Sequence, residues 1–284
     1  MTTSIHSAFR FSINVTLLFL FLTAQADQSR APQKSVATYL GNEAVMVEHG
    51  SAKILFDPFF HNAFGYYQLV PEHIRKAIFE GMTPYDNIDA IFISHAHADH
   101  FSATDVEQFL EAFPGVTLVA PSQAIDQVKQ AAKLDDSKVN IIAIDLEYQD
   151  APVAHDLGKI KFDAVRIPHA GWPQRADVSN IVYRVTLGGE LTVVHMGDAD
   201  TDDAHYKPLM SHWQSQAVNT AFPPYWFFIS RSGPLVLSER IAAETNIGIH
   251  VPVDVPPELK ASGARYFSVP EQQFEFSSGK ILVH

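Results

Sequence analysis

One short run of residues limits the possible folds more than any other part of this sequence. The run His95-Ala96-His97-Ala98-Asp99-His100 places four potential metal ligands within six residues, a density that rarely arises by chance. It follows the apolar stretch Ala90–Ser94, which has the pattern of a buried β-strand, and it precedes a stretch with helical periodicity. We therefore expect a strand, a ligand-bearing turn and a helix to follow one another here.

The spacing within this run suits metal binding. Residues i and i+2 of an extended segment point the same way, so His95 and His97 can share one ion. The turn that follows can direct Asp99 and His100 towards a second ion. Imidazole and carboxylate groups bind zinc at about 2 Å and leave positions open for water and substrate. The alternative, an exposed polar loop without metal, does not account for so many potential ligands together.

The rest of the chain has the pattern of alternating strands and helices. Apolar side chains from Val106 to Phe113 follow the i, i+3, i+4, i+7 spacing of one helix face, and Ser102 or Thr104 can cap the start of this helix. The first half also contains predicted strands and helices at Val36–Leu40, Ala44–Glu48, Lys53–Phe56, Glu72–Glu80 (helix), Val116–Ala120, Ala124–Lys133 (helix) and Val139–Ile144. In the second half we predict Lys159–Ile167, Ile181–Leu187, Leu191–His195, Asp202–Met210 (helix), Leu235–Ala243 (helix) and a final strand at Ile247–Val251. Two similar halves, each supplying a sheet covered by helices, indicate an α/β fold.

Two aromatic-rich segments are candidates for the walls of a binding pocket. They are the insertion Phe59–Asn87 and the loop Phe222–Phe228. A hydrophobic cluster beneath long loops is an equally good interpretation of both. Trp172, which follows His169 closely, is a further candidate for lining the pocket. Arg166, Arg175 and Arg231 could each meet an anionic substrate group, and nothing in the sequence distinguishes one of them.

The order of the potential ligands resembles that of the metallo-β-lactamase superfamily. The resemblance rests first on the H-x-H-x-D-H run after a buried strand, and it extends over nearly the whole chain after the N-terminal segment. His169 follows a strand in mid-chain, Asp198 ends a later strand in a Gly-Asp pair, and His250 ends a late strand, as the remaining ligands of the family do. The resemblance implies the fold of this family, a four-layer αβ/βα sandwich.

The resemblance also implies an assignment of ligands to two ions, most simply Zn²⁺. The first ion would be held by His95, His97 and His169, the second by Asp99, His100 and His250, and Asp198 would bridge them. The family further implies that Asp99 is catalytic and orients or shuttles a proton. Within the superfamily, the segments Tyr39–Asn42 and Leu55–Pro58 resemble a lactonase-like group that includes phospholipase D-type enzymes.

Other ionisable residues are expected to have supporting or unrelated roles. His195 lies within an apolar strand and is predicted to be a core histidine or a residue behind the ligands, and Asp57 is predicted to order the metal loop rather than bind metal. Asp200, Asp202 and Asp203 lie beyond the strand end and are predicted to begin a solvated acidic helix. By default we assign the remaining histidines to surface or loop positions: His61, His73, His155, His205, His212 and His284.

The N-terminal segment has the parts of a secretory signal peptide. Arg10 precedes the apolar stretch Phe11–Leu22, and an A-x-A cleavage site ends at Ala26. The apolar stretch is shorter than the ~20 residues that span a bilayer, so we expect cleavage rather than a stable membrane anchor. The expected organisation is a signal peptide over residues 1–26 and one hydrolase domain over 27–284, exported to the periplasm or secreted. The sequence has no cysteine, which excludes disulfides and thiolate metal ligands.

Charge and composition narrow the possible partners. The formal net charge is −12 and the cations are not clustered, so nucleic acid is not an expected partner. We expect a small-molecule substrate whose ester, lactone, amide or phosphodiester bond is cleaved by a hydroxide held between two metals, because such ions lower the pKa of water to about 7. The alternatives are an iron-dependent oxidoreductase on the same scaffold and a non-catalytic metal-binding or ligand-binding protein.

Overall fold

The computed structural model describes residues 1–2, 35–131, 138–277 and 280–283. The chain separates into two units, Met1–Ala31 and Pro32–His284, and the fold given below is that of the second unit. The predicted signal peptide and its cleavage site lie outside the described residues, apart from the first two positions. Within the described ranges, no helix combines the length and the apolar character needed to cross a membrane.

The first of two sheets has eight strands in the order β15-β14-β1-β2-β3-β4-β5-β6. Strands β1 to β3 form an antiparallel meander, and β3 to β6 run parallel to one another. The strands are β1 (Ser35–Gly41), β2 (Ala44–His49), β3 (Ala52–Phe56), β4 (Ala90–Phe92), β5 (Thr117–Pro121), β6 (Asn140–Ile144), β14 (Gln273–Ser277) and β15 (Lys280–Val283).

The second sheet has seven strands in the order β13-β12-β11-β10-β9-β8-β7. Gly188 and Gly189, both with positive φ, form the turn of the hairpin between β9 and β10, as the sequence predicted. The strands are β7 (Val153–Asp156), β8 (Ile160–Arg166), β9 (Ile181–Leu187), β10 (Leu191–His195), β11 (Thr220–Phe222), β12 (Thr245–Gly248) and β13 (Arg265–Tyr266).

The two sheets pack face to face because their strands are apolar on both sides. In β2, Val45 and Val47 belong to the core between the sheets, whereas Met46 belongs to the outer core under the helices. Phe92 of β4 shows the contact across the interface, since its ring lies 5.2 Å from both Phe162 of β8 and Tyr183 of β9. Burial of each such ring contributes roughly 1.5–3 kcal/mol.

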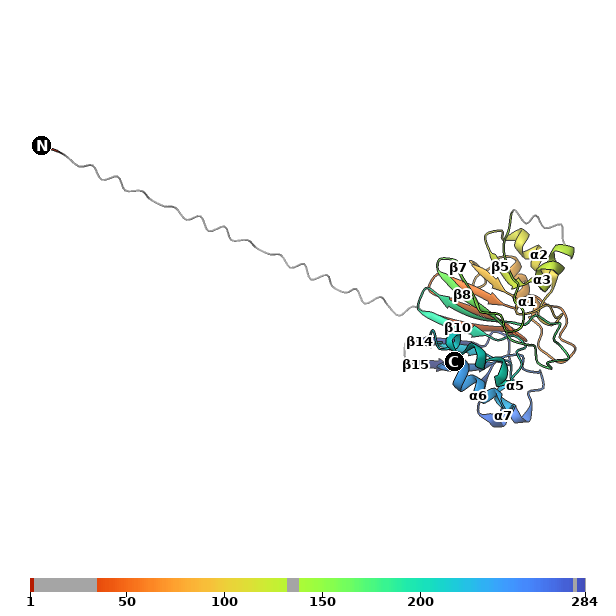
Figure 1. Ribbon diagram of the computed structural model, residues 1–284. Coiled ribbons are helices and arrows are strands. Elements are labelled where there is room, and N and C mark those ends of the chain that lie inside the picture. Colours follow the sequence, from red (N-terminus) through yellow and green to blue (C-terminus); the bar gives the residue numbers. More distant parts are fainter. Residues whose placement is uncertain (3–34, 132–137, 278–279, 284) are drawn as a thin grey trace. The chain divides into compact units, whose positions relative to one another are not determined.

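Helices cover the outer face of each sheet, which completes four layers (Figure 1). Ser102 accepts a hydrogen bond from the amide of Asp105 and caps α2, as predicted. The helices over the first sheet are α1 (Glu72–Phe79), α2 (Ala103–Ala112) and α3 (Ser122–Ala131). Those over the second sheet are α4 (Met210–Trp213), α5 (Trp226–Ile229) and α6 (Gly233–Val236), which continues into the π-helical turn η3 (Leu237–Ile241). The predicted αβ/βα sandwich is confirmed.

Two sequence predictions about secondary structure were wrong, and several strands were not predicted. Residues Asp202–Met210 form two 3₁₀ turns rather than a helix, η1 (Asp203–His205) and η2 (Lys207–Leu209), with Pro208 at the start of η2. Strand β12 is not the last strand, because a short α7 (Pro257–Ser262) leads to β13, β14 and β15. The edge strand β7 was not predicted. Strand β14 pairs with β1 at the other end of the chain, a partner that no local pattern can specify.

Candidate metal centre

The candidate site lies where many strands end at the same edge of their sheets. The turn after β1 supplies Glu43, the end of β3 supplies Asp57, and the loop after β4 carries the residues His95 to His100. In the second sheet, β8, β10 and β12 run in the same direction and are followed by His169, Asp198 and His250. Equal strand direction therefore brings residues from distant parts of the chain to one place, and all seven predicted ligands meet there.

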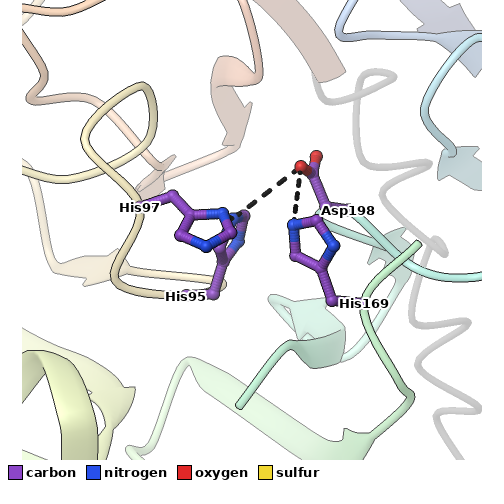
Figure 2. A group of neighbouring side chains, drawn as sticks. All are labelled: His95, His97, His169 and Asp198. Carbon is purple, nitrogen blue, oxygen red and sulfur yellow. Dashed lines mark hydrogen bonds and ion pairs between the residues drawn. The ribbon is translucent and has the colours of Figure 1, made fainter. Parts of the chain in front are cut away.

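The first cluster contains the residues predicted to hold the first ion (Figure 2). His95 Nε2 lies 3.0 Å from His97 Nδ1, and His169 Nε2 lies 3.0 Å from Asp198 Oδ2. The same Asp198 oxygen is 3.8 Å from His95 Nε2. The ring nitrogens and the carboxylate oxygen thus converge on one small volume.

The second cluster contains Asp99, His100 and His250. His100 Nε2 lies 3.3 Å from His250 Nε2, and these nitrogens are 3.7 and 3.6 Å from Asp99 Oδ2. The other oxygen of Asp198, Oδ1, is 3.4 Å from His100 Nε2 and 3.1 Å from His250 Nε2. Asp198 therefore presents one oxygen to each cluster, which is the geometry of a bridging ligand.

These residues fit a pair of divalent cations. Within the described chain, every ion pair of Asp57, Asp99 and Asp198 is with a histidine, so no Lys or Arg balances their charge. Buried carboxylates require a cation or a full set of hydrogen bonds. Asp198 Oδ1 and His169 Nε2 have neither solvent contact nor a hydrogen-bond partner among the described residues. Imidazole and carboxylate donors match zinc, iron and manganese.

Burial and neighbouring charges set the protonation of the site without metal. Burial, followed by the influence of His100, lowers the pKa of His95 well below its usual range. Burial also lowers the pKa of His250, but Asp198 and Asp99 outweigh it and raise this pKa to about 9. Burial alone would raise the pKa of Asp198, yet His250 and His100 hold it well below its usual range. A divalent cation would replace the proton on His250, so metal binding should weaken as pH falls.

Backbone positions around the site are unusual and fix the ligands. His250 and Asp57 adopt left-handed φ values of 56° and 41°, which non-glycine residues rarely do. Gly197, with φ 53°, precedes Asp198 in a space where a Cβ atom would lie 2.4 Å from Asn180 Oδ1 and 2.7 Å from Ser94 Cβ. Only glycine fits at this position, so the Gly-Asp pair is required by the geometry of the turn.

Asp57 orders the metal loop, as the sequence predicted. Its carboxylate accepts hydrogen bonds from the backbone N–H of Ser94 at 2.7 Å and from the Ser94 hydroxyl. Asp57 Oδ2 is also 3.1 Å from Nδ1 of His100. The hydrogen bond at Nδ1 directs the Nε2 of His100 towards the second cluster.

Two asparagines that the sequence analysis did not identify also hold the ligand loops. Asn42 donates a side-chain hydrogen bond to the carbonyl of Asp99 at 2.9 Å, and its own carbonyl accepts the N–H of His250 at 3.0 Å. The side-chain oxygen of Asn180 accepts the N–H of Asp198 at 2.9 Å. Both residues occur in ordinary loop sequences, which carry no signal of this role.

Glu43 was also missed, and it is the least expected residue of the site. Its side chain is fully buried, and neither carboxyl oxygen has a hydrogen-bond partner among the described residues. Oε2 lies 3.5 Å from Nδ1 of His100. Burial, followed by the charges of Asp198 and Asp57, raises the pKa of Glu43 well above its usual range.

The histidines outside the predicted ligand set are distributed largely as expected. His195 is buried, stacks on Phe56 with ring centroids 4.6 Å apart, and donates through Nε2 to the carbonyl of Glu43 at 3.0 Å. It is a core histidine behind the ligands, as predicted. The default surface assignment was wrong for His205, which is buried and hydrogen bonds through Nδ1 to the hydroxyl of Tyr148 at 2.8 Å. His284 lies outside the described residues.

A cavity of about 520 Å³ opens above the two clusters. Its walls contain Tyr67 and Phe64 from the first aromatic segment, Trp226 from the second, and Arg175. The other members of these segments are mostly core residues, including Phe59, Phe60, Phe79, Tyr85, Phe222 and Phe227. Each aromatic segment therefore contributes some residues to the cavity wall and others to the hydrophobic core. Trp172 is not in the cavity wall, because its ring packs 4.8 Å from that of Tyr148.

Two facing sheets, outer helices and a ligand cluster at one edge define a sandwich of the metallo-β-lactamase type. The family model for the β-lactamase superfamily domain matches residues 37–212, which is more than half of the chain. The chain belongs to this superfamily. The matched region contains six of the seven predicted ligands, and His250 follows it.

Individual known proteins share the fold with this chain. A UPF0173 metal-dependent hydrolase from Agrobacterium fabrum is 35% identical over 98 residues, 34% of this chain and 37% of that protein. The chain matches only about a third of the length of its curated relatives. The metallo-β-lactamase fold protein YhfI from Bacillus subtilis is 14% identical with a TM-score of 0.57, over 86% of this chain and 100% of YhfI. CmlA, a diiron β-hydroxylase from Streptomyces venezuelae, is 13% identical with a TM-score of 0.50, over 87% of this chain and 55% of CmlA.

Proposed function

We propose that this protein is a metal-dependent hydrolase that uses two divalent metal ions to cleave an ester, lactone, amide or phosphodiester bond in a small molecule. One observation carries the proposal. Two ligand clusters, of imidazole and carboxylate groups, share the two oxygens of Asp198 at the floor of one cavity. When bound, two metals at such a site would lower the pKa of water and polarise the oxygen of the substrate. Zn²⁺ is the ion we expect at the histidine-rich first cluster.

The residues of the chain would divide the remaining work. His95, His97 and His169 would fix one ion, and Asp57 would keep His100 oriented towards the other through Nδ1. Asp99 lines the cavity, so its carboxylate is available to a water molecule that binds at the floor. We assign to Asp99 the acceptance of a proton from the attacking water and its transfer to the leaving group.

The walls of the cavity support a small, partly apolar substrate. A volume of about 520 Å³ suits a small molecule, and Tyr67 and Trp226 offer aromatic surface. Arg175 is the cationic side chain in the wall and makes no ion pair with the described residues. An anionic group on the substrate would fit beside it. The lactonase-like and phospholipase D-type branch remains our prediction for the substrate class.

A second candidate is an iron-dependent oxidoreductase. The observation in its favour is Glu43, which brings a further buried carboxylate to the second cluster, and carboxylate-rich sites suit iron as well as zinc. Bound iron together with substrate-dependent oxygen consumption would support this candidate.

Export and a small-molecule substrate complete the proposal. The signal-like residues 1–26 support secretion to the periplasm or medium, and the acidic composition without clustered cations supports the absence of nucleic-acid binding. Sequencing the N-terminus of the protein from the exported fraction tests the first point. We expect Asp27 as the first residue, and an intact Met1 on cytoplasmic protein would contradict export.

The function is tested by a substrate panel of lactones, phosphodiesters, carboxylic esters and β-lactams on metal-loaded protein. We expect turnover of at least one class, abolished by chelation and restored by adding metal. His97→Ala should lose this turnover together with metal from the first cluster, whereas His73→Ala, on the exposed face of α1, should lose neither. Metal-loaded protein that hydrolyses no member and consumes oxygen instead would support the second candidate.

A further inference from the structure

Glu43 has no role in the ligand set described so far, although its environment is costly for a carboxylate. It lies in the turn between β1 and β2, its side chain is fully buried, and both carboxyl oxygens lack a hydrogen-bond partner in the described chain. Burial of an ionised carboxylate without partners is strongly unfavourable unless a cation balances it. The turn is held firmly in place, because the adjacent Asn42 hydrogen bonds to both the Asp99 and the His250 backbone.

The neighbours of Glu43 point to a metal ion as the balancing cation. A carboxylate oxygen of Glu43, one of Asp198 and a ring nitrogen of His250 all lie within 4.8 Å of one another. Among the described residues, each ion pair of Glu43 is with an imidazole, at 3.5 Å to His100 and 3.9 Å to His195. The upper limit of 4.8 Å is compatible with ligands that surround one divalent ion at about 2.0–2.2 Å.

Orientation of His100 does not explain Glu43. Asp57 Oδ2 already lies 3.1 Å from the Nδ1 of His100, closer than Glu43 at 3.5 Å. The N–H at Nδ1 of His100 needs only one acceptor, which Asp57 supplies. This hydrogen bond therefore does not require the carboxylate of Glu43. His195 likewise donates through Nε2 to the backbone carbonyl of Glu43 rather than to its carboxylate, which is 3.9 Å away.

We infer that Glu43 is a ligand of the second metal position and adapts that position to an oxygen-preferring cation such as Mn²⁺. The second position then has three carboxylates, Glu43, Asp99 and Asp198, beside two imidazoles, whereas the first has three imidazoles and one carboxylate. Carboxylate ligands suit manganese and imidazole ligands suit zinc, although Zn²⁺ generally binds a given site more tightly than Mn²⁺. The centre would therefore hold one Zn²⁺ and one Mn²⁺ when Zn²⁺ is limited to one equivalent and Mn²⁺ is in excess. This inference rests on the proposed two-metal centre.

Metal binding by the isosteric variant Glu43→Gln tests the inference without reference to activity. Full-length protein is stripped of metal, supplied with one equivalent of Zn²⁺ and an excess of Mn²⁺, and measured by elemental analysis and by the Mn²⁺ electron paramagnetic resonance signal. We expect one equivalent of each metal in the wild type. In Glu43→Gln, Mn²⁺ affinity should fall about 10- to 100-fold while one Zn²⁺ is retained. Glu43→Asp keeps the charge on a shorter side chain, so its Mn²⁺ affinity should lie between those of the wild type and Glu43→Gln.

Asp202→Asn is the control, because it removes an exposed carboxylate outside both ligand clusters, and it should keep wild-type Mn²⁺ affinity. Wild-type Mn²⁺ affinity in folded Glu43→Gln, checked by circular dichroism, would overturn the inference and leave the proposed hydrolase intact. A wild-type protein that takes up no Mn²⁺ beside its one Zn²⁺ would also overturn it. A wild-type protein that binds neither metal would overturn the proposed function as well.

Discussion

Replacing Asp198 by asparagine should separate a bridging ligand from its acidic neighbours. Asp198 presents Oδ2 to His169 at 3.0 Å and Oδ1 to His250 at 3.1 Å, so a single side chain serves both clusters. Asp198→Asn keeps the shape of the side chain and the backbone bond from its N–H to Asn180, which preserves the turn. It removes the negative charge that two adjacent cations require, and an amide nitrogen then replaces one donor oxygen.

The expected loss of metal and of activity follows from the ligand and the charge that the substitution removes. One of the two ions would lose a protein ligand, because the amide nitrogen of asparagine does not bind metal, and the pair would lose the charge between them. We expect the variant to retain about one metal equivalent instead of two. Activity should fall at least ~10²-fold, equivalent to ~2.7 kcal/mol in the activation free energy. The assays are elemental analysis of protein dialysed against metal-free buffer and kcat/KM on the substrate found in the panel.

Asp202→Asn is the matched control. Asp202 is exposed and caps a short 3₁₀ turn by accepting the N–H of Ala204 at 2.9 Å, a role that asparagine fills equally well. This variant should keep two metals and wild-type kinetics. The reasoning about the bridge would be refuted by two tightly bound metals and unchanged kcat/KM in Asp198→Asn.

Three further predictions concern the cavity and the pH dependence of stability. Tyr67→Ala and Trp226→Ala should raise KM about 10-fold and change Tm little, because both rings face the cavity; a large fall in Tm with unchanged kinetics would show that they are core residues. Arg175→Ala should raise KM about 10- to 100-fold for anionic substrates and leave that of neutral analogues unchanged, and equal effects on both would contradict an anion-binding role. Burial, followed by Arg184, lowers the pKa of His212 to about 4, so the unfolded chain binds a proton first and stability should fall as pH drops from about 6.5 to about 4. For this half-buried group we expect the free energy of unfolding to fall by about 1 kcal/mol after solvent screening. The measurement compares urea unfolding of the wild type and of His212→Gln at pH 7 and at pH 4.5. An equal pH dependence of stability in both proteins would argue against this role of His212.

The parts of the fold that the sequence predicted are those with strong local patterns. The meander β1–β3 and strand β4 were predicted because apolar residues fill both faces of these strands, and helix α2 because its apolar face and Ser102 cap are local. Strand β14 was missed because its partner β1 lies at the other end of the chain. The η1 and η2 turns were overpredicted as a helix because periodicity does not report that Pro208 interrupts it.

The predicted ligands came from a dense motif and from a resemblance, whereas the supporting residues did not. A run of four ligands is improbable by chance, so His95 to His100 could be identified directly. Glu43 stands alone in a turn between two strands, and only the closure of the sandwich brings it to His100. His205 was misplaced for the same reason, because its burial depends on Tyr148, a residue of a distant loop. A single polar residue in a sequence does not indicate whether the fold will bury it or bring it to a metal site.

The composition of the two clusters has a consequence for biosynthesis. Each cluster takes side chains from both sheets: His95 and His97 meet His169, and His100 meets His250, a residue 150 positions later. Neither half of the chain can bind an ion in this way by itself, so a ribosome must release almost the whole domain before the second ion finds its ligands. Metal can therefore bind only after the two sheets have packed together, and each bound ion then links an early and a late part of the polypeptide. A truncated or half-folded chain would lack these links and would remain susceptible to proteolysis.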